Sequence, residues 1–160
     1  MFSVYDMLGS TTIKILIMEP LYQVSDYQPA FFFKRFIARL LDRLFAGFLG
    51  IICYLFFNLF DNSAIEGVGI LIGIFLALVY LLVKDALPFL NGQSLGKKAM
   101  SIRVIDNNTA SIITNEYGKA ISREIIQWIP LLNLVDAIMV FSSDGRRLGD
   151  KWADTYVVEV

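Results

Sequence analysis

The sequence contains no histidine and only one cysteine among its 160 residues. An intrachain disulfide is therefore impossible, and zinc sites built from Cys and His and catalytic pairs that need histidine are excluded. Cys53 lies in an apolar run, where a thiol usually behaves as a small buried hydrophobe. No nucleophile, metal set or nucleotide motif accompanies the carboxylates, so we expect no metal, no cofactor and no enzymatic activity.

Charge is also scarce. Charged residues make up 18% of the chain and hydrophobic residues 56%, against about 25% and about 45–50% in ordinary globular proteins. The mean hydropathy is +0.60, and the net charge of −1 leaves no basic excess of the kind that binds nucleic acid. The composition predicts an α-helical integral membrane protein.

Two long apolar runs carry this prediction. Leu44–Phe60, extended back to Phe36, and the uncharged Gly67–Val83 each approach the 17–25 residues or so that cross a bilayer. Asp61–Glu66 between them is long enough only for a turn. We therefore predict a hairpin of two transmembrane helices, over residues 36–60 and 67–83.

Small residues recur along both runs at helical spacing. Ala46 and Gly50 lie on the first run, and Gly69, Gly73 and Ala77 lie on the second. Such spacing lets two helix backbones approach closely in lipid. Gly50 and either Gly73 or Ala77 lie at similar depth, so we expect them to meet.

The distribution of Lys and Arg predicts the orientation. The turn 61–66 has neither, whereas the flanking segments carry the basic residues Lys14, Lys34, Arg35, Lys84, Lys97, Lys98 and Arg103. Positive residues stay on the cytoplasmic side of a membrane. We expect a multi-pass protein of the cell membrane with both termini in the cytoplasm.

Short β-like segments surround the hairpin. Residues 99–114 read as a β-hairpin turning at 106–109, and residues 155–160 read as a strand. Thr11–Met18 predicts another strand in an N-terminal cytoplasmic segment, 1–29, that precedes a membrane domain over 30–160. These pieces predict a small cytoplasmic sheet.

A third apolar segment, 121–141, is interrupted by Pro130 and by several polar residues, among them Asn133 and Asp136. A full crossing would place the basic residues that follow it outside the cell. We therefore favour a broken helix that is re-entrant or lies in the interface, with a true third span as the alternative.

Charges close to these apolar segments are the candidate functional residues. Asp42 follows Arg39 on one helix and is expected to neutralise Arg39 or Arg43, and Asp85 is expected to reach Arg39 across the hairpin. The candidates for an ion pathway or a structural charge network are Arg39, Asp42, Asp85, Asn133, Asp136, Arg146 and Asp150. The residues expected at lipid headgroups are Lys34, Arg35, Lys97, Lys98 and Arg147.

The loop after the second apolar run and the C-terminal tail each contain a further pattern. Gly92–Lys98 is similar to a phosphate-binding loop, but it lacks one residue between its glycines and has Lys98 where Ser or Thr would bind magnesium. A basic turn on anionic lipid fits it better. In the tail, Asp144-Gly145 indicates a turn, and Asp150 is expected to pair with Arg146 and Arg147.

Three blocks together resemble the RDD family of membrane proteins: Arg35–Asp42, Gln93–Lys98 with Ile102–Val104, and Arg146–Lys151 with Thr155–Val158. By this resemblance the hallmark arginine is Arg39, with Arg35 as the rival, and the first aspartate is Asp42. The second aspartate is Asp150 or Asp136. Arg43 departs from the small or apolar residue expected after Asp42.

The resemblance implies architecture more than activity. It suggests transport, with sodium–proton antiport proposed for some members of the family, so we predict movement of cations, protons or a small polar solute by an oligomer. The alternative is a non-transporting scaffold or accessory subunit that docks a partner through its cytoplasmic sheet. The expected partners are membrane lipids and either further copies of the chain or another membrane protein.

Overall fold

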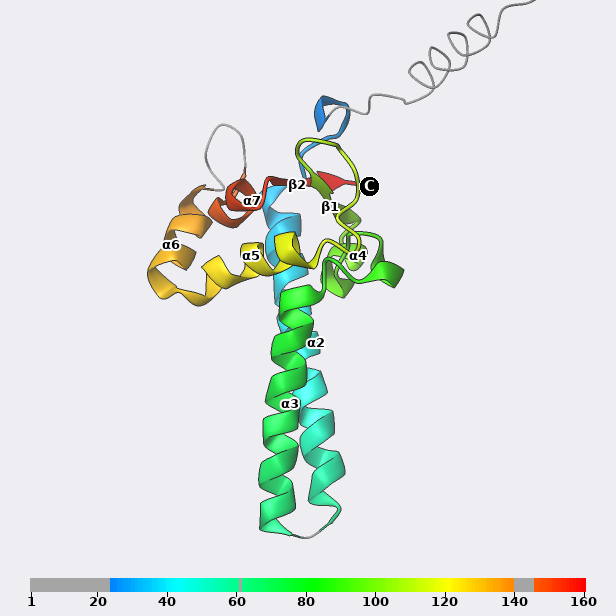
Figure 1. Ribbon diagram of the computed structural model, residues 1–160, viewed down its shortest axis with the longest axis vertical. Coiled ribbons are helices and arrows are strands. Elements are labelled where there is room, and N and C mark those ends of the chain that lie inside the picture. Colours follow the sequence, from blue (N-terminus) through cyan, green and yellow to red (C-terminus); the bar gives the residue numbers. More distant parts are fainter. Residues whose placement is uncertain (1–23, 61, 140–145) are drawn as a thin grey trace, which may run out of the picture.

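The computed structural model describes residues 24–60, 62–139 and 146–160. Figure 1 shows two parts: a long helical hairpin, α2 and α3, and at one of its ends a group of short helices and two strands. We call this second part, residues 84–139 and 146–160, the head. A short 3-10 turn, η1 (Val24–Asp26), precedes α2.

Helix α2 (Phe32–Asn58) and helix α3 (Ser63–Val83) are both long and apolar enough to cross a membrane. With 27 and 21 residues, they are about 40 Å and about 31 Å long, against a hydrocarbon core of about 30 Å. Both helices begin earlier than predicted. The side chain of Asn62 caps α3 by accepting from the N–H groups of Ala64 and Ile65, so the predicted turn over 61–66 is shorter.

The two helices pack through glycine. A Cβ atom at Gly73 would lie 3.1 Å from both Cα and the carbonyl oxygen of Gly50, so the predicted contact between these glycines is confirmed. Gly69 faces the ring of Phe57 in the same manner. Cys53 borders this contact and is half-buried, not fully buried as expected.

The sheet pairs β1 (Ile102–Asp106) with β2 (Thr155–Glu159) in antiparallel register, with Val104 opposite Val157. The strand predicted at the C-terminal end is confirmed as β2. The prediction that residues 99–114 form a β-hairpin is wrong. Its two arms are joined by the single bridge between Ile105 and Ile112, and β1 pairs with β2 instead.

Burial explains why β1 prefers β2. Its side chains Ile102 and Val104 join Ala38 of α2, Ile113 and Val157 in one buried apolar cluster, which a local hairpin alone would leave open to solvent. Residue Ala99 belongs to the short helix α4 (Leu95–Ala99), not to a strand. The predicted strand Thr11–Met18 lies outside the described residues.

The third apolar segment is broken, as predicted. Helix α5 (Tyr117–Trp128) ends at Ile129, and α6 (Pro130–Met139) begins at the proline, which has no N–H to continue the first helix. Their lengths of about 18 Å and about 15 Å are too short for either to span a bilayer. Two short elements complete the head, η2 (Pro88–Leu90) and α7 (Leu148–Trp152), and α7 packs against α5.

Candidate functional site

Buried charges gather where the head meets the hairpin. We use the name charge network for the ionisable residues there: Arg35, Arg39, Asp42, Lys84, Asp85, Lys97, Arg123, Glu124, Asp136, Arg147 and Asp150. Burying a charge costs several kcal/mol unless a partner compensates it. The partners therefore decide what each member can do.

Asp42 receives three hydrogen bonds from outside its own helix. The N–H of Gly96 donates to its Oδ1 at 2.8 Å, the hydroxyl of Tyr80 donates to the same oxygen at 3.2 Å, and the hydroxyl of Ser94 donates to Oδ2 at 2.5 Å. The expected pairing of Asp42 with Arg39 or Arg43 is not formed, and Arg43 is exposed on the helix surface. Asp42 thus joins α2 to α3 and to the start of α4.

Gly96 makes this arrangement possible. A Cβ atom there would collide with the carbonyl oxygen of Ala38 on α2. Ser94 caps α4 by accepting from the N–H of Lys97 while its own hydroxyl donates to Asp42. The sequence that is similar to a phosphate loop is therefore a docking turn that places α4 on α2.

Asp85 lies just beyond α3 and is fully buried. Its Oδ2 forms ion pairs with Lys97 and, at 3.4 Å, with Nη1 of Arg123, so the expected partner Arg39 is wrong. Burial alone would raise the pKa of Asp85, but the charges of Lys97, Lys84 and Arg123 hold that pKa well below its ordinary value. Burial in turn lowers the pKa of Lys97 to about 8.

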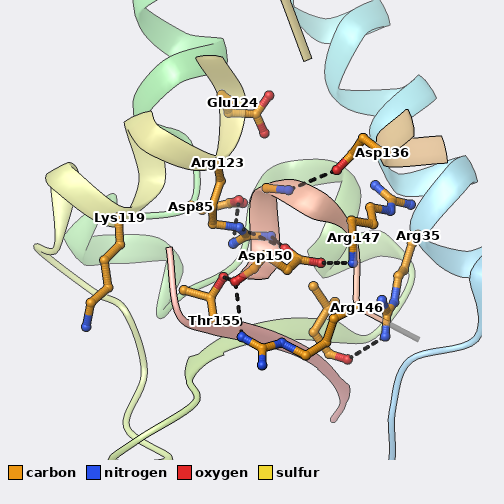
Figure 2. Close-up of polar contacts among 12 residues, drawn as sticks. Arg35, Asp85, Lys119, Arg123, Glu124, Asp136, Arg146, Arg147, Asp150 and Thr155 are labelled. Carbon is orange, nitrogen blue, oxygen red and sulfur yellow. Dashed lines mark hydrogen bonds and ion pairs between the residues drawn. The ribbon is translucent and has the colours of Figure 1, made fainter. Parts of the chain in front are cut away.

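Asp150 pairs with Arg123 of α5, with Nη2 at 2.7 Å and Nε at 3.0 Å from Oδ1 (Figure 2). The backbone N–H of Arg147 donates to Oδ2 of Asp150, and the side chain of Arg146 donates to the backbone carbonyl oxygen of Asp150. Although burial opposes it, the charge of Arg123 lowers the pKa of Asp150. The ion pair of Asp150 is therefore with Arg123, and the charge of Arg147 also lowers the pKa of Asp150.

Asp136 of α6 supplies the partner of Arg39. The N–H of Gly149 donates to its Oδ1 at 3.0 Å, and Nη2 of Arg39 lies 3.5 Å from Oδ2. Asp136 thus joins α6 to α7 and to α2. Asn133 lies on the same helix, α6. Arg39, Asp42, Asp85, Asp136 and Asp150 lie together here, with different partners from those expected.

The five residues expected at lipid headgroups lie in three different surroundings. Arg35 is buried and donates to the carbonyl oxygen of Val157, and Lys97 is held by Asp85. Lys34 pairs with Glu159 at 2.7 Å on the half-exposed surface, and Lys98 is exposed. Arg147 is half-buried beside Arg35 and Arg39.

A small cavity of about 30 Å³ lies inside the charge network. Its lining residues are Arg35, Arg39, Asp42, Lys84, Lys97, Arg123, Glu124, Gln127, Arg147 and Val157. A water needs about 10–15 Å³ by the same measure, so the cavity has room for about two waters or two oxygen atoms of a bound group. Within the described residues, no group of three acidic or thiol side chains could hold a metal ion.

Several residues that belong to the charge network or contact it were not among the candidates from sequence. Tyr80, Ser94 and Gly96 contact Asp42, and Arg123 joins two carboxylates. Ser94 had a local signal, since a serine that opens a helix is a common cap. Arg123 had one too, because it is a lone arginine within an apolar segment.

Two long apolar helices that carry a charged, partly buried head define a small membrane protein. The sequence model of the RDD family matches residues 29–154, most of the chain, and the protein belongs to this family. No curated protein and no solved structure matches it.

Proposed function

We propose that this RDD-family protein is a non-transporting, non-enzymatic accessory protein of the cell membrane, in which the charged residues fix a polar head on a membrane hairpin. The observation that carries this proposal is the set of three donors on Asp42, which come from α3, from the cap of α4 and from its first turn. A carboxylate held in this way is occupied by its structural role, which leaves it poorly suited to binding and releasing ions.

The other carboxylates support the same role. Asp136 connects α2, α6 and α7, Asp85 connects the end of α3 with α4 and α5, and Asp150 connects α7 with α5. Each one bridges elements that are distant in the sequence. The charge network therefore does in the head what apolar side chains do in a larger core.

We place the head on the cytoplasmic side, because the basic residues flank the hairpin and its turn has none. In this placement α5 and α6 lie in the interface. This helix pair exposes five large apolar side chains, with exposed fractions of 41–73%: Trp128, Ile129, Leu131, Val135 and Ile138. Interfacial helices bury such side chains among lipid headgroups. The short lengths of α5 and α6 favour this over a third span.

A partner of the head would bind to its surface and would not extend its sheet. One edge of β2 is covered by the chain before α2, through the bridge between Pro29 and Val158. The outer edge of β1 is covered by Gly92, which accepts from the N–H of Val104, and by Ile112. Strand addition needs an open edge, so docking through the sheet, which the scaffold alternative expects, becomes docking on the head surface.

The test compares folding with flux. Wild type, Asp42→Asn and Asp150→Asn are purified in detergent, their thermal unfolding is measured, and each is reconstituted in liposomes with a pH-sensitive dye under sodium and potassium gradients. The proposal expects loss of stability in both variants and no cation-dependent proton movement in any. A flux in wild type that disappears in a well-folded Asp42→Asn would contradict it.

Transport is the second candidate, favoured by the polar cavity at the junction of head and hairpin. Two helices enclose no pathway, so transport requires further copies of the chain. An apolar groove of about 340 Å³ along the hairpin, lined by small residues that include Gly50 and Gly73, is a surface on which another helix could pack. Crosslinking through Cys53 at the edge of this region, combined with the flux assay, would test this candidate.

A further inference from the structure

The cavity inside the charge network has more positive than negative charge around it. Six of its lining residues are basic and two, Asp42 and Glu124, are acidic. The carboxylates of Asp85, Asp136 and Asp150 lie behind this lining. When these three carboxylates are added to the two acidic residues of the lining, the six basic residues still outnumber the acidic ones. The cavity is therefore suited to a group of negative charge.

Arg147 contributes to the excess. Four other basic residues of the lining have carboxylate partners: Arg39 has Asp136, Lys84 has Glu124, Lys97 has Asp85, and Arg123 has Asp85 and Asp150. Among the residues that the structure describes, no carboxylate forms an ion pair with the guanidinium of Arg147. Its side chain points toward α2, into the region that Arg35 and Asp136 border (Figure 2).

Charges of both signs surround Arg147: Arg39 and Arg35 disfavour its protonated form, and Asp150 and Asp136 favour it. Burial, followed by the charge of neighbouring Arg39, lowers the pKa of Arg147 to about 10, although the group stays protonated at neutral pH. The carboxylates nearest to Arg147 are engaged elsewhere, Asp136 with Gly149 and Arg39, and Asp150 with Arg123. A bound anion would supply the charge that this corner of the network lacks.

We propose that this cavity binds a phosphate-type oxyanion through Arg147, with Arg39 and Arg35 on the α2 side. The planar fork of a guanidinium matches two oxygens of one phosphate, and the cavity has room for about two such oxygens. The occupant is either free phosphate or the headgroup phosphate of an anionic lipid.

The position of the cavity in the fold fits a headgroup. Arg35 and Arg39 lie in the first two turns of α2, and Lys84 directly follows α3. The apolar stretches of both helices end at this level, which is where the phosphates of a bilayer lie. Arg147 as a residue is half-buried, so its side chain reaches the cavity from the surface of the head.

The experiment uses the full chain, delipidated in a zwitterionic detergent. In one arm, thermal unfolding is followed against inorganic phosphate, with chloride at equal ionic strength as the reference. In the other arm, binding of phosphatidylglycerol and of phosphatidylcholine from mixed micelles is measured by native mass spectrometry. Three variants are compared with wild type: Arg147→Gln, Arg147→Lys, and Lys98→Gln, which removes an exposed charge outside the cavity.

We expect Arg147→Gln to weaken binding of the effective probe about tenfold or more, since it removes a charge-assisted hydrogen-bonding group. Arg147→Lys should lie between it and wild type, and Lys98→Gln should remain within about twofold of wild type. Because no described carboxylate pairs with Arg147, circular dichroism should show Arg147→Gln folded. Stabilisation by phosphate identifies a free anion, and binding of phosphatidylglycerol alone identifies a headgroup; either result supports the site.

Two results would overturn the proposal: no response of wild type to phosphate or phosphatidylglycerol, or equal loss of binding in Arg147→Gln and Lys98→Gln. Both concern the anion alone. The accessory role is tested separately by flux and by the stability of Asp42→Asn, so either proposal can fail without the other.

Discussion

The hairpin and the head solve the same packing problem with opposite means. In the hairpin, Gly50 meets Gly73 backbone to backbone, and most large apolar side chains point outward. In the head, Asp42, Asp85 and Asp150 are each fully buried and hold neighbouring elements by hydrogen bonds and ion pairs. In lipid, apolar side chains on the outside of the hairpin are already well solvated, so close packing of small residues determines how the two helices pair. In the small head, buried charges determine which elements pack together.

The largest effect should come from the contact between the two regions. Gly96→Ala places a Cβ atom against the carbonyl oxygen of Ala38, so α4 cannot lie on α2. We expect a loss of more than about 4 kcal/mol in the free energy of unfolding. Gly118→Ala is the matched control, because nothing lies within 4 Å of a Cβ atom there and alanine favours a helix by about 0.5–1 kcal/mol. Equal thermal stability of the two variants would refute this contact.

Next in size is the ion pair of the head. Asp150→Asn leaves Arg123 buried with Asp85 alone, and we expect a loss of about 3–5 kcal/mol. Asp154→Asn is the control, since Asp154 is 60% exposed and lies 3.6 Å from Arg146. It should cost less than about 1 kcal/mol. Chemical denaturation in detergent, followed by the fluorescence of the head's tryptophans, measures both.

The same pair predicts the pH dependence of the head. The pKa of Asp150 is lower in the folded protein than its ordinary value of about 3.9. The stabilisation is therefore complete above about pH 4 and is lost as the pH falls through the folded pKa. Thermal unfolding of wild type from pH 7 to pH 3 should show this loss, and Asp150→Asn should show a smaller one. An unchanged profile in the variant would assign the acid sensitivity to other carboxylates.

A smaller effect is expected in the hairpin. Gly73→Ile would push α3 away from Gly50 and Cys53, each 3.1 Å from a Cβ atom at this position, at a cost of about 1–3 kcal/mol. Gly67→Ile is the control, because nothing lies within 4 Å of its Cβ position. Unfolding by sodium dodecyl sulfate reports the strength of the helix contact. If Gly73→Ile and Gly67→Ile weaken the hairpin equally, the contact between Gly73 and Gly50 does not hold the two helices together.

The smallest effect should come from the surface. Lys34→Gln removes a 2.7 Å ion pair with Glu159 in which both side chains are about one-third exposed. Exposed pairs contribute about 0–1 kcal/mol, so the unfolding temperature should barely change, and any difference should vanish in high salt. If Lys34→Gln lowered the stability as much as Asp150→Asn does, the difference in burial between the two ion pairs would not explain their contributions.

The hairpin could be predicted from sequence because its signals are local. The apolar runs, the glycine spacing and the break at Pro130 each depend on neighbouring residues. For the head, the sequence predicted several of the residues in the charge network but not which of them pair. Charges in apolar surroundings marked Arg39, Asp42 and Asp136 as out of place, but nothing local in the sequence states which of them meet.

The partners were missed because they are distant along the chain. Ser94 and Gly96 are 52 and 54 positions from Asp42, and Asp136 is 97 positions from Arg39. With several acids and bases available, i,i+3 and i,i+4 spacing favoured the nearest pairings. The strand β1 was misjudged for the same reason: Ile112 was the nearer partner, yet burial selected β2.

The closure of the head by β2 has a consequence for biosynthesis. The carbonyl oxygen of Val157 accepts from the N–H of Ala30 and from the side chain of Arg35, and the N–H of Glu159 donates to Gln28. The segment that leads into α2 is therefore completed by a strand that is synthesised after both helices of the hairpin. Until then the newly made chain has an unfinished head, and chaperones and proteases act on such incomplete domains.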